Sequence, residues 1–195
     1  MENKNDRPLV SFIVTTYNLP TTLLCECLQS ILSLSLSKEE REIIVVDDGS
    51  EVSPLNDLVE LRDKIVYVRQ RNKGLSEARN MGLVCAQGKF IQFVDGDDYL
   101  IQAPYEHCLD IARYKDADII LFHETEEEQP EVPFECNGPM TGSAYMHQYN
   151  LRASACGYLF RANILGNLRF TPNLLHEDEE FTPQLFLRAE HMYFT

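Results

Sequence analysis

Three carboxylates stand close together in the segment Asp95-Gly96-Asp97-Asp98, which directly follows the apolar run Phe90–Val94. Carboxylates at this spacing repel one another unless a cation or hydrogen-bond donors share their site. Oxygen ligands of this kind suit Mn²⁺ or Mg²⁺, which keep several waters and also bind a substrate diphosphate. The spacing is not that of an EF-hand loop. The alternative is an acidic turn that begins the next helix, with Asp97 or Asp98 as its N-cap.

Two other polar segments also follow apolar runs. Val10–Val14 is followed by Thr15-Thr16-Tyr17-Asn18, and Ile43–Val46 by Asp47-Asp48-Gly49-Ser50. The second segment is an ordinary Asp-Gly turn in the simplest interpretation. Its carboxylates could instead accept hydrogen bonds from a uracil N–H or a ribose hydroxyl.

A basic loop, Arg71–Gly74, precedes a helical pattern that carries Arg79. Lysine, arginine and a helix N-terminus together favour a phosphate-bearing ligand. The alternative is a solvated helix start in which Glu77 screens Arg79. The glycine-rich P-loop pattern does not occur in the sequence.

A second acidic cluster, His176–Glu180, precedes an apolar helical pattern that starts at Phe181. Acidic residues are favourable at a helix start for electrostatic reasons alone. One of these carboxylates could also serve as a general base for an incoming hydroxyl. The cluster does not match the HExxH pattern, which excludes a zinc protease of that type.

Five apolar runs predict the strands that must position these segments. Most are β-branched and continuous rather than alternating, which is typical of strands covered on both faces. The runs are Val10–Val14, Ile43–Val46, Ile65–Val68, Phe90–Val94 and Ile119–Phe122. Helical patterns alternate with them, so we expect an α/β fold with a mostly parallel sheet and helices on both faces. The polar segments should then meet at the carboxyl edge of that sheet.

Helix boundaries and the C-terminal half are less sharply marked. We expect Pro20 in the first turn of one helix and Gly88 at the end of another. Ala144–Leu151 looks helical, and Gly157–Phe160 looks like a short strand. The charged segment Glu124–Pro139 is expected to be a mobile loop.

Composition limits the class of protein. The formal net charge of −14 disfavours nucleic acid as a partner. The sequence has no apolar run long enough to span a membrane and no secretory signal at its start, so we expect a cytoplasmic protein. The six cysteines lack paired spacing and are expected to be reduced, buried and helical.

Taken in order, five stretches resemble the family-2 glycosyltransferases with the GT-A fold. They cover nearly all of the chain from Val10 to Phe181, and their register makes the resemblance specific. The stretches are Val10–Asn18, Val45–Ser50, Asn72–Gly82, Phe93–Asp98 and His176–Phe181.

The resemblance implies an inverting, metal-assisted transfer from a nucleoside-diphosphate sugar, usually a UDP-sugar, to a glycan or lipid-linked acceptor. It implies a base-contacting role for Thr15 and Asp48, with Asp47 beside them. Asp178 matches the catalytic base, and Glu177 is the less favoured choice. The remaining donor-binding positions are Tyr17, Lys73, Arg79, Asp95 and Asp97, and the metal, Mn²⁺ or Mg²⁺, would be held by Asp97 and Asp98.

We expect residues 1–195 to form a single GT-A domain, with a nucleotide-sugar-binding half at 1–100 and a partial acceptor half at 101–195. The family usually has a longer C-terminal part, so we expect a truncated chain whose missing part gives peripheral association with the inner face of the cell membrane. Two alternatives remain: a catalytically silent nucleotide-sugar-binding module, and a sugar nucleotidyltransferase. A sugar nucleotidyltransferase normally has a glycine- and arginine-rich loop after its first strand, and this sequence has none there. A receiver domain with an acidic pocket is also conceivable, but it would be shorter than this chain.

Overall fold

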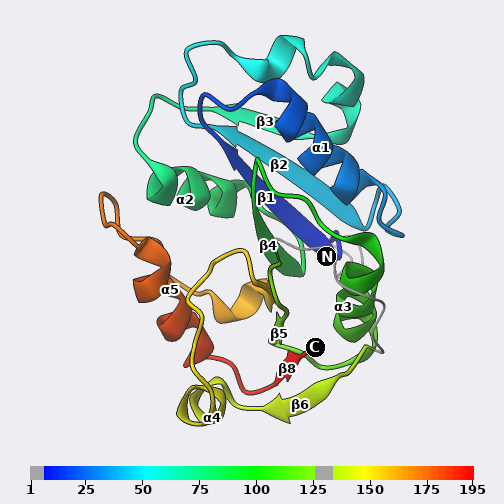
Figure 1. Ribbon diagram of the computed structural model, residues 1–195, viewed down its shortest axis with the longest axis vertical. Helices are drawn as coiled ribbons and strands as arrows, with labels where there is room; N and C mark the ends of the chain where they lie inside the picture. Colours follow the sequence, from blue (N-terminus) through cyan, green and yellow to red (C-terminus); the bar gives the residue numbers. More distant parts are fainter. Residues whose placement is uncertain (1–6, 126–133) are drawn as a thin grey trace, which may run out of the picture.

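The computed structural model describes residues 7–125 and 134–195 of the chain. An eight-stranded sheet runs through it in the order β3-β2-β1-β4-β7-β5-β8-β6 (Figure 1). The strands are β1 (Val10–Thr16), β2 (Arg41–Asp47), β3 (Val66–Arg69), β4 (Phe90–Asp95), β5 (Ile119–Leu121), β6 (Asn137–Met140), β7 (Tyr158–Arg161) and β8 (Met192–Phe194).

The sheet is parallel in its first half and mixed in its second. β1 pairs in parallel with β2 and β4, and β2 pairs in parallel with β3. β7 lies antiparallel between β4 and β5. β8 is parallel to β5, and β6 is antiparallel to β8. The predicted α/β fold with a mostly parallel sheet is confirmed, and the sheet is continuous across the predicted halves of the chain.

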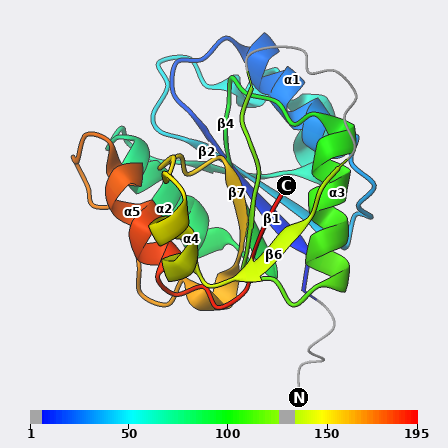
Figure 2. The same ribbon diagram turned by 60° about the horizontal axis from the view of Figure 1, so that its bottom comes forward.

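Helices cover both faces of the sheet (Figures 1 and 2). Residues of α1 and α3 belong to one buried cluster, and residues of α2, α4 and α5 belong to the other. The helices are α1 (Thr21–Leu32), α2 (Leu75–Cys85), α3 (Gln102–Tyr114), α4 (Gly142–Gln148) and α5 (Glu177–Phe186), with short 3₁₀ segments at Pro54–Asn56, Val59–Lys64 and Ala162–Ile164. None of the helices in the described part of the chain is long and apolar enough to cross a membrane.

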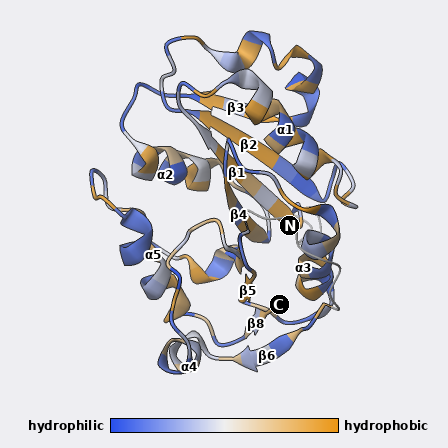
Figure 3. Cartoon of the chain, viewed as in Figure 1, coloured by the Kyte–Doolittle hydropathy of each residue, from blue (hydrophilic) through white to orange (hydrophobic). Residues whose placement is uncertain are grey.

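The central strand β1 shows why the sheet needs two helical layers. Phe12 and Val14 point into the cluster under α1 and α3, whereas Ile13 points into the cluster under α2 and α5. All three side chains are fully buried. A strand that is apolar at successive positions can bury its side chains only when both of its faces are covered. Figure 3 shows this apolar centre as largely orange strands, with helices of mixed colour on either side.

The five predicted strands all form, with small changes at their ends. β3 differs in burial, because it is an edge strand and Val66 is 46% exposed. Pro20 is the N-cap of α1 rather than a residue of its first turn. Gly88 lies beyond the end of α2, and its amide donates a hydrogen bond to Ser11 Oγ across 2.8 Å.

The predicted helix and strand of the C-terminal half are confirmed as α4 and β7. The prediction that Glu124–Pro139 is entirely a loop was wrong at its end, because β6 begins at Asn137 and pairs with β8. Residues 126–133 of that segment lie outside the described residues. The Glu124 side chain is fixed by an ion pair with Arg152 (3.2 Å).

All six cysteines are free thiols, as predicted, but their location was only partly predicted. Four lie in helices α1, α2 and α3. Of these four, Cys27 and Cys108 are buried as predicted, whereas Cys25 and Cys85 are only half-buried. The prediction was also wrong for Cys136, which is exposed and precedes β6, and for Cys156, which lies in a loop. Neither position belongs to an amphipathic helix, so the helical burial that we expected does not apply to them.

Gly82 sets how closely α2 approaches β1. A Cβ atom at this position would lie 2.2 Å from Ile13 Cγ2, and Ile13 is a stiff β-branched side chain with no exposed surface. We expect Gly82→Ala to lower the free energy of unfolding by about 1–2 kcal/mol, since overpacking outweighs the better helix propensity of alanine.

Urea denaturation measures this change. Val84→Ala is the matched control on the same helix, because Val84 is 72% exposed and its substitution should be nearly neutral. A Gly82→Ala protein at least as stable as the unchanged protein would contradict the packing argument.

Candidate functional site

The carboxyl ends of β1, β2 and β4 meet at one edge of the sheet, as the sequence predicted. In the parallel register, Thr16 pairs with Asp47 and Thr15 pairs with Asp95. The three polar segments that follow these strands are therefore neighbours, with the β1 segment in the middle. This edge is where open parallel sheets bind their ligands.

Asp47 is fully buried, and its carboxylate is used inside the protein. Its Oδ1 accepts a hydrogen bond from the Ser50 amide (2.8 Å), and its Oδ2 accepts one from the Tyr67 hydroxyl (2.7 Å). Arg69 Nε lies 3.3 Å from the same Oδ2. Burial acts to raise the pKa of Asp47, but the hydrogen bonds and Arg69 outweigh it and lower that pKa. Asp47 thus stabilises the turn after β2.

Asp48 holds the basic loop against the end of β2. Its Oδ1 accepts hydrogen bonds from Gln70 Nε2 (2.7 Å) and the Lys73 amide (2.9 Å), and its Oδ2 accepts one from the Gly74 amide (2.8 Å). Gly74 has φ +87°, a backbone conformation that glycine adopts without strain. The Lys73 side chain is exposed, so its ammonium is free to approach a ligand at this edge.

The turn after β1 combines buried and exposed groups. Thr15 is buried, and its Oγ1 lies 3.4 Å from Asp95 Oδ1. The Asn18 amide donates a hydrogen bond to Ser50 Oγ across 2.9 Å, which ties this turn to the turn after β2. Tyr17 lies between them with 52% of its surface exposed. Of these residues, Tyr17 therefore offers the most surface to a ligand.

The acidic segment after β4 forms a tight turn rather than a helix start. The Asp98 amide donates to the Asp95 carbonyl (3.0 Å), and α3 begins only at Gln102 with Ile101 as its N-cap. The interpretation of Asp97 or Asp98 as the N-cap is thus wrong. Their side chains are exposed at the edge of the sheet.

Several carboxylates lie close together at this turn. Burial and the neighbouring charges of Asp95, Asp97 and Glu124 raise the pKa of Asp98. The donor atoms are carboxylate oxygens, which Mn²⁺ and Mg²⁺ prefer. No group of three metal-ligating side chains gathers within residues 7–125 and 134–195.

Arg79 connects the turn after β4 to the second acidic cluster. Its guanidinium Nη2 lies 3.1 Å from Asp95 Oδ1, and its Nη1 lies 2.6 Å from Glu177 Oε1. The residue is only 4% exposed. Burial acts to lower the pKa of Arg79, but the nearby carboxylates raise it overall, so its charge is retained.

Two aromatic rings also lie against the Arg79 guanidinium. The guanidinium carbon lies 5.9 Å from the centre of the Phe93 ring and 5.4 Å from that of Phe170. Phe170 stacks on Phe181 of α5 with ring centres 3.9 Å apart. Asn80 exchanges two hydrogen bonds with the backbone of Phe170, at 2.8 and 2.9 Å. α2 thereby holds the segment that leads into α5.

Asp178 lies in the first turn of α5 and is half-buried. Its Oδ1 accepts a hydrogen bond from the Glu179 amide (3.1 Å), and it forms no ion pair with any residue that the structure describes. Glu177, in contrast, is paired with Arg79. The resemblance already favoured Asp178 over Glu177, and of these two neighbours Asp178 is the one without an ion pair to a described residue.

Several residues of the site were not singled out from the sequence. Tyr67 and Gln70 bind the carboxylates of the turn after β2, and Phe170 packs on Arg79. Tyr67 and Gln70 lie in or just after β3, where parallel pairing with β2 brings them to the same edge. The sequence did offer one signal for Tyr67 and Gln70. They lie near the carboxyl end of a predicted strand, as the polar residues after β1, β2 and β4 do.

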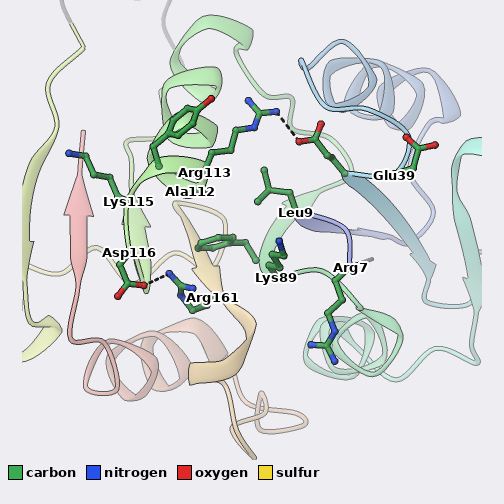
Figure 4. Close-up of a pocket in the computed structure, with 12 residues that line it drawn as sticks. Arg7, Leu9, Glu39, Lys89, Ala112, Arg113, Lys115, Asp116 and Arg161 are labelled. Atoms are coloured by element: carbon green, nitrogen blue, oxygen red, sulfur yellow. Dashed lines mark hydrogen bonds and ion pairs between the residues drawn. The ribbon is translucent and has the colours of Figure 1, made fainter. Parts of the chain in front are cut away.

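A cavity lies elsewhere, at the amino ends of β1 and β4 (Figure 4). It measures about 810 Å³ and is lined by a mixture of acidic and basic side chains. Two of its arginines are already paired, Arg113 with Glu40 (3.6 Å) and Arg161 with Asp116 (2.8 Å). The polar strand ends and the two acidic clusters are at the opposite edge, so this cavity is separate from the candidate site.

The comparisons with known proteins agree with this geometry. A sequence model of the family described as "Glycosyl transferase family 2" matches residues 11–149. The glycosyltransferase EpsJ of Bacillus subtilis is 31% identical over 204 residues, which cover 95% of this chain and 58% of EpsJ. The glycosyltransferase GlyA of Streptococcus pneumoniae is 28% identical over 206 residues, 95% of this chain and 29% of GlyA.

A solved structure shows the same fold. The crystal structure of S. aureus TarS 1-349 in complex with UDP-GlcNAc superposes with a TM-score of 0.80 at 26% identity, covering 95% of this chain and 55% of that one. The chain thus spans only about half of TarS 1-349 and of EpsJ. The GT-A fold implied by the resemblance is confirmed. Since the family match extends over most of the described sheet, this chain belongs to glycosyl transferase family 2.

Proposed function

We propose that the protein carrying this chain transfers a sugar from a nucleoside-diphosphate sugar, most simply a UDP-sugar, to a hydroxyl of a glycan or lipid-linked acceptor. The observation that carries the proposal is the position of two acidic clusters, Asp95–Asp98 and Glu177–Asp178, on either side of Arg79. One cluster fits a metal-bound diphosphate, and the other supplies a carboxylate for the acceptor. The family membership of the chain and the UDP-GlcNAc complex of TarS support this donor class.

The nucleoside end of the donor would lie against the turns after β1 and β2. Thr15 and Tyr17 line one side, and the loop held by Asp48 lines the other. Asp47 and Asp48 would act mainly by shaping these turns, because their oxygens are already hydrogen-bonded within the protein. Lys73 would be the exposed cation nearest to the phosphates.

Asp97 and Asp98 would hold Mn²⁺ or Mg²⁺, which would neutralise the negative charge that grows on the leaving diphosphate. Asp95 would remain paired with Arg79 beside them. The exposed carboxylates of Asp97 and Asp98 would thus bind the ion, whereas the carboxylate of Asp95 would stay in its ion pair with Arg79.

Asp178 would act as the general base. A hydroxyl is a poor nucleophile until its proton is removed, so Asp178 would take that proton as the oxygen attacks the anomeric carbon. The bond from that carbon to the diphosphate breaks in the same step. Attack on the face opposite the leaving group inverts the configuration at the anomeric carbon. A catalytically silent nucleotide-sugar-binding module would have no use for such a base. The effect of Asp178→Asn on turnover distinguishes an enzyme from such a module.

The first prediction concerns metal-dependent binding. We expect Asp98→Ala and Asp97→Ala to weaken Mn²⁺-dependent UDP binding at least about 10-fold, or about 1.4 kcal/mol, because the ion loses a charged ligand. Calorimetry with UDP, in Mn²⁺ and in EDTA, measures this loss. Asp63→Ala, at an exposed position in the 3₁₀ segment Val59–Lys64, is the control. Equal UDP affinity in EDTA and Mn²⁺ would reject the metal.

The second prediction concerns stability without metal. The pKa of Asp98 is raised above its ordinary 3.8, so its ionisation opposes folding and this cost appears as pH rises through the raised value. We expect Asp98→Asn to raise the melting temperature of the metal-free protein at pH 7, and the gain to disappear near pH 3. Thermal unfolding at both pH values measures it. If Asp98→Asn were less stable than the unchanged protein at pH 7, the negative charge of Asp98 would be stabilised by its surroundings, contrary to this prediction.

The third prediction concerns the base. We expect Asp178→Asn to lower turnover by about 10²- to 10⁴-fold while the Kd for UDP stays unchanged. The measurement uses the full-length protein and the release of UDP from UDP-GlcNAc. Glu179→Gln, at the exposed neighbouring position, is the control. Normal turnover in Asp178→Asn together with an inactive Glu177→Gln protein would move the base to Glu177.

A further inference from the structure

We propose that Arg79 is a positioning residue, whose guanidinium fixes Glu177 and therefore the first turn of α5 against the carboxylates that end β4. The inference rests on the proposed function and deepens it. The family resemblance implied that Arg79 contacts the donor, whereas the structure assigns it to the placement of Asp178.

The guanidinium forms its two ion pairs with different elements. Nη2 contacts Asp95 at the end of β4, and Nη1 contacts Glu177 at the start of α5. A planar guanidinium keeps its donors in a rigid fork, so these two carboxylates are held at a fixed separation. An ammonium is a single point charge and cannot hold two separated partners in the same way.

Burial leaves Arg79 little surface with which to contact a nucleotide-sugar directly. Arg79 is 4% exposed, and its two terminal nitrogens already donate to carboxylates. Its Nε is buried without a hydrogen-bond partner. Phe93 and Phe170 lie against the guanidinium. Little of the Arg79 guanidinium is therefore accessible to a donor unless a neighbouring side chain moves.

Helix geometry explains how Glu177 can orient its neighbour. Successive residues of an α-helix point about 100° apart, because 3.6 residues complete a turn. When Glu177 is fixed toward Arg79, the rotation of the first turn is set and Asp178 must point in a different direction. The backbone enters this turn through His176, which has φ +56°. The ion pair thereby selects which acidic side chain of α5 faces the donor edge.

The hydrogen bonds of Asn80 connect α2 to the segment that leads into α5, and not to α5 itself. They bind the backbone of Phe170 and do not reach either carboxylate. In the part of the chain that the structure describes, the ion pairs of Arg79 are the direct link from the end of β4 to Glu177. A substitution of Arg79 that breaks these two ion pairs should therefore disturb α5, even when the hydrogen bonds of Asn80 persist.

Arg161 offers a matched control. It is also paired with an aspartate, Asp116, at 2.8 Å, and it also lies over an aromatic ring, Phe90, at 5.2 Å. Its position is in the cavity at the opposite edge of the sheet (Figure 4). An Arg→Lys change there has similar chemistry but no path to Asp178.

The test compares Arg79→Lys and Arg161→Lys in the full-length protein, with Mn²⁺ and UDP-GlcNAc as the probe. We expect Arg79→Lys to lower kcat by about 10- to 100-fold, since a small misplacement of a reacting group has effects of this size. The KM for UDP-GlcNAc and the Kd for UDP should change less than about threefold. Arg161→Lys should leave kcat unchanged. In Glu177→Gln combined with Arg79→Lys, kcat should be no lower than in the worse single variant.

Three outcomes would overturn the inference. A weaker Kd for UDP with unchanged kcat in Arg79→Lys would make Arg79 a donor contact. An equal loss of kcat in Arg161→Lys would mean that the loss in Arg79→Lys comes from a general loss of stability and not from the position of α5. Full activity in Arg79→Lys would show that lysine positions α5 equally well and that the fork is unnecessary.

Hydrogen exchange separates this inference from the proposed function. If the unchanged protein releases no UDP from any nucleotide-sugar, the proposed function fails. The inference then depends on α5, whose amides should exchange faster in Arg79→Lys than in Arg161→Lys, while those of α1 stay the same. Unchanged exchange in α5 would overturn the positioning role on its own.

Discussion

The bridge formed by Arg79 is the interaction on which the rest of the site depends. Three carboxylates lie at the end of β4 and in the turn after it, and four lie in the first turn of α5. Arg79 is the buried cation between them. Without it, Asp95 and Glu177 would be left as uncompensated, partly buried charges, which is strongly unfavourable. The aromatic packing of Phe170 on Phe181 supports the same junction. α5 is therefore attached to the sheet by charge and by ring stacking together.

Burial divides the carboxylates of this edge into two kinds. Asp47 and Asp48 are buried and fully used in holding the turn after β2 and the loop before α2. Asp97 and Asp98 are exposed residues. Partial burial of the Asp98 carboxyl, and then the charges of its acidic neighbours, raise the pKa of Asp98. The buried pair gives the edge its shape, while the exposed pair keeps oxygen atoms for a ligand. Both kinds look alike in the sequence, because each is an Asp-Asp pair beside a glycine.

The fold was predictable where the sequence pattern was strong. Runs rich in apolar residues identified β1, β2 and β4, since these strands are buried on both faces. β6 was missed, because Asn137–Met140 contains glycine and proline and is exposed at the sheet margin. The antiparallel direction of β7 was also hidden. Strand direction depends on how the chain returns to the sheet, and local residue preferences do not encode it.

The sequence by itself determined that polar segments follow the central strands, and the rule for parallel sheets brought those segments to one edge. It also contained both acidic clusters and the basic residues between them. Only the tertiary structure decided which residues are partners. Arg79 pairs with Glu177, 98 positions away, and this pairing separates Glu177 from Asp178. Such a contact depends on how α2 and α5 pack across the sheet, which short-range patterns along the chain cannot specify.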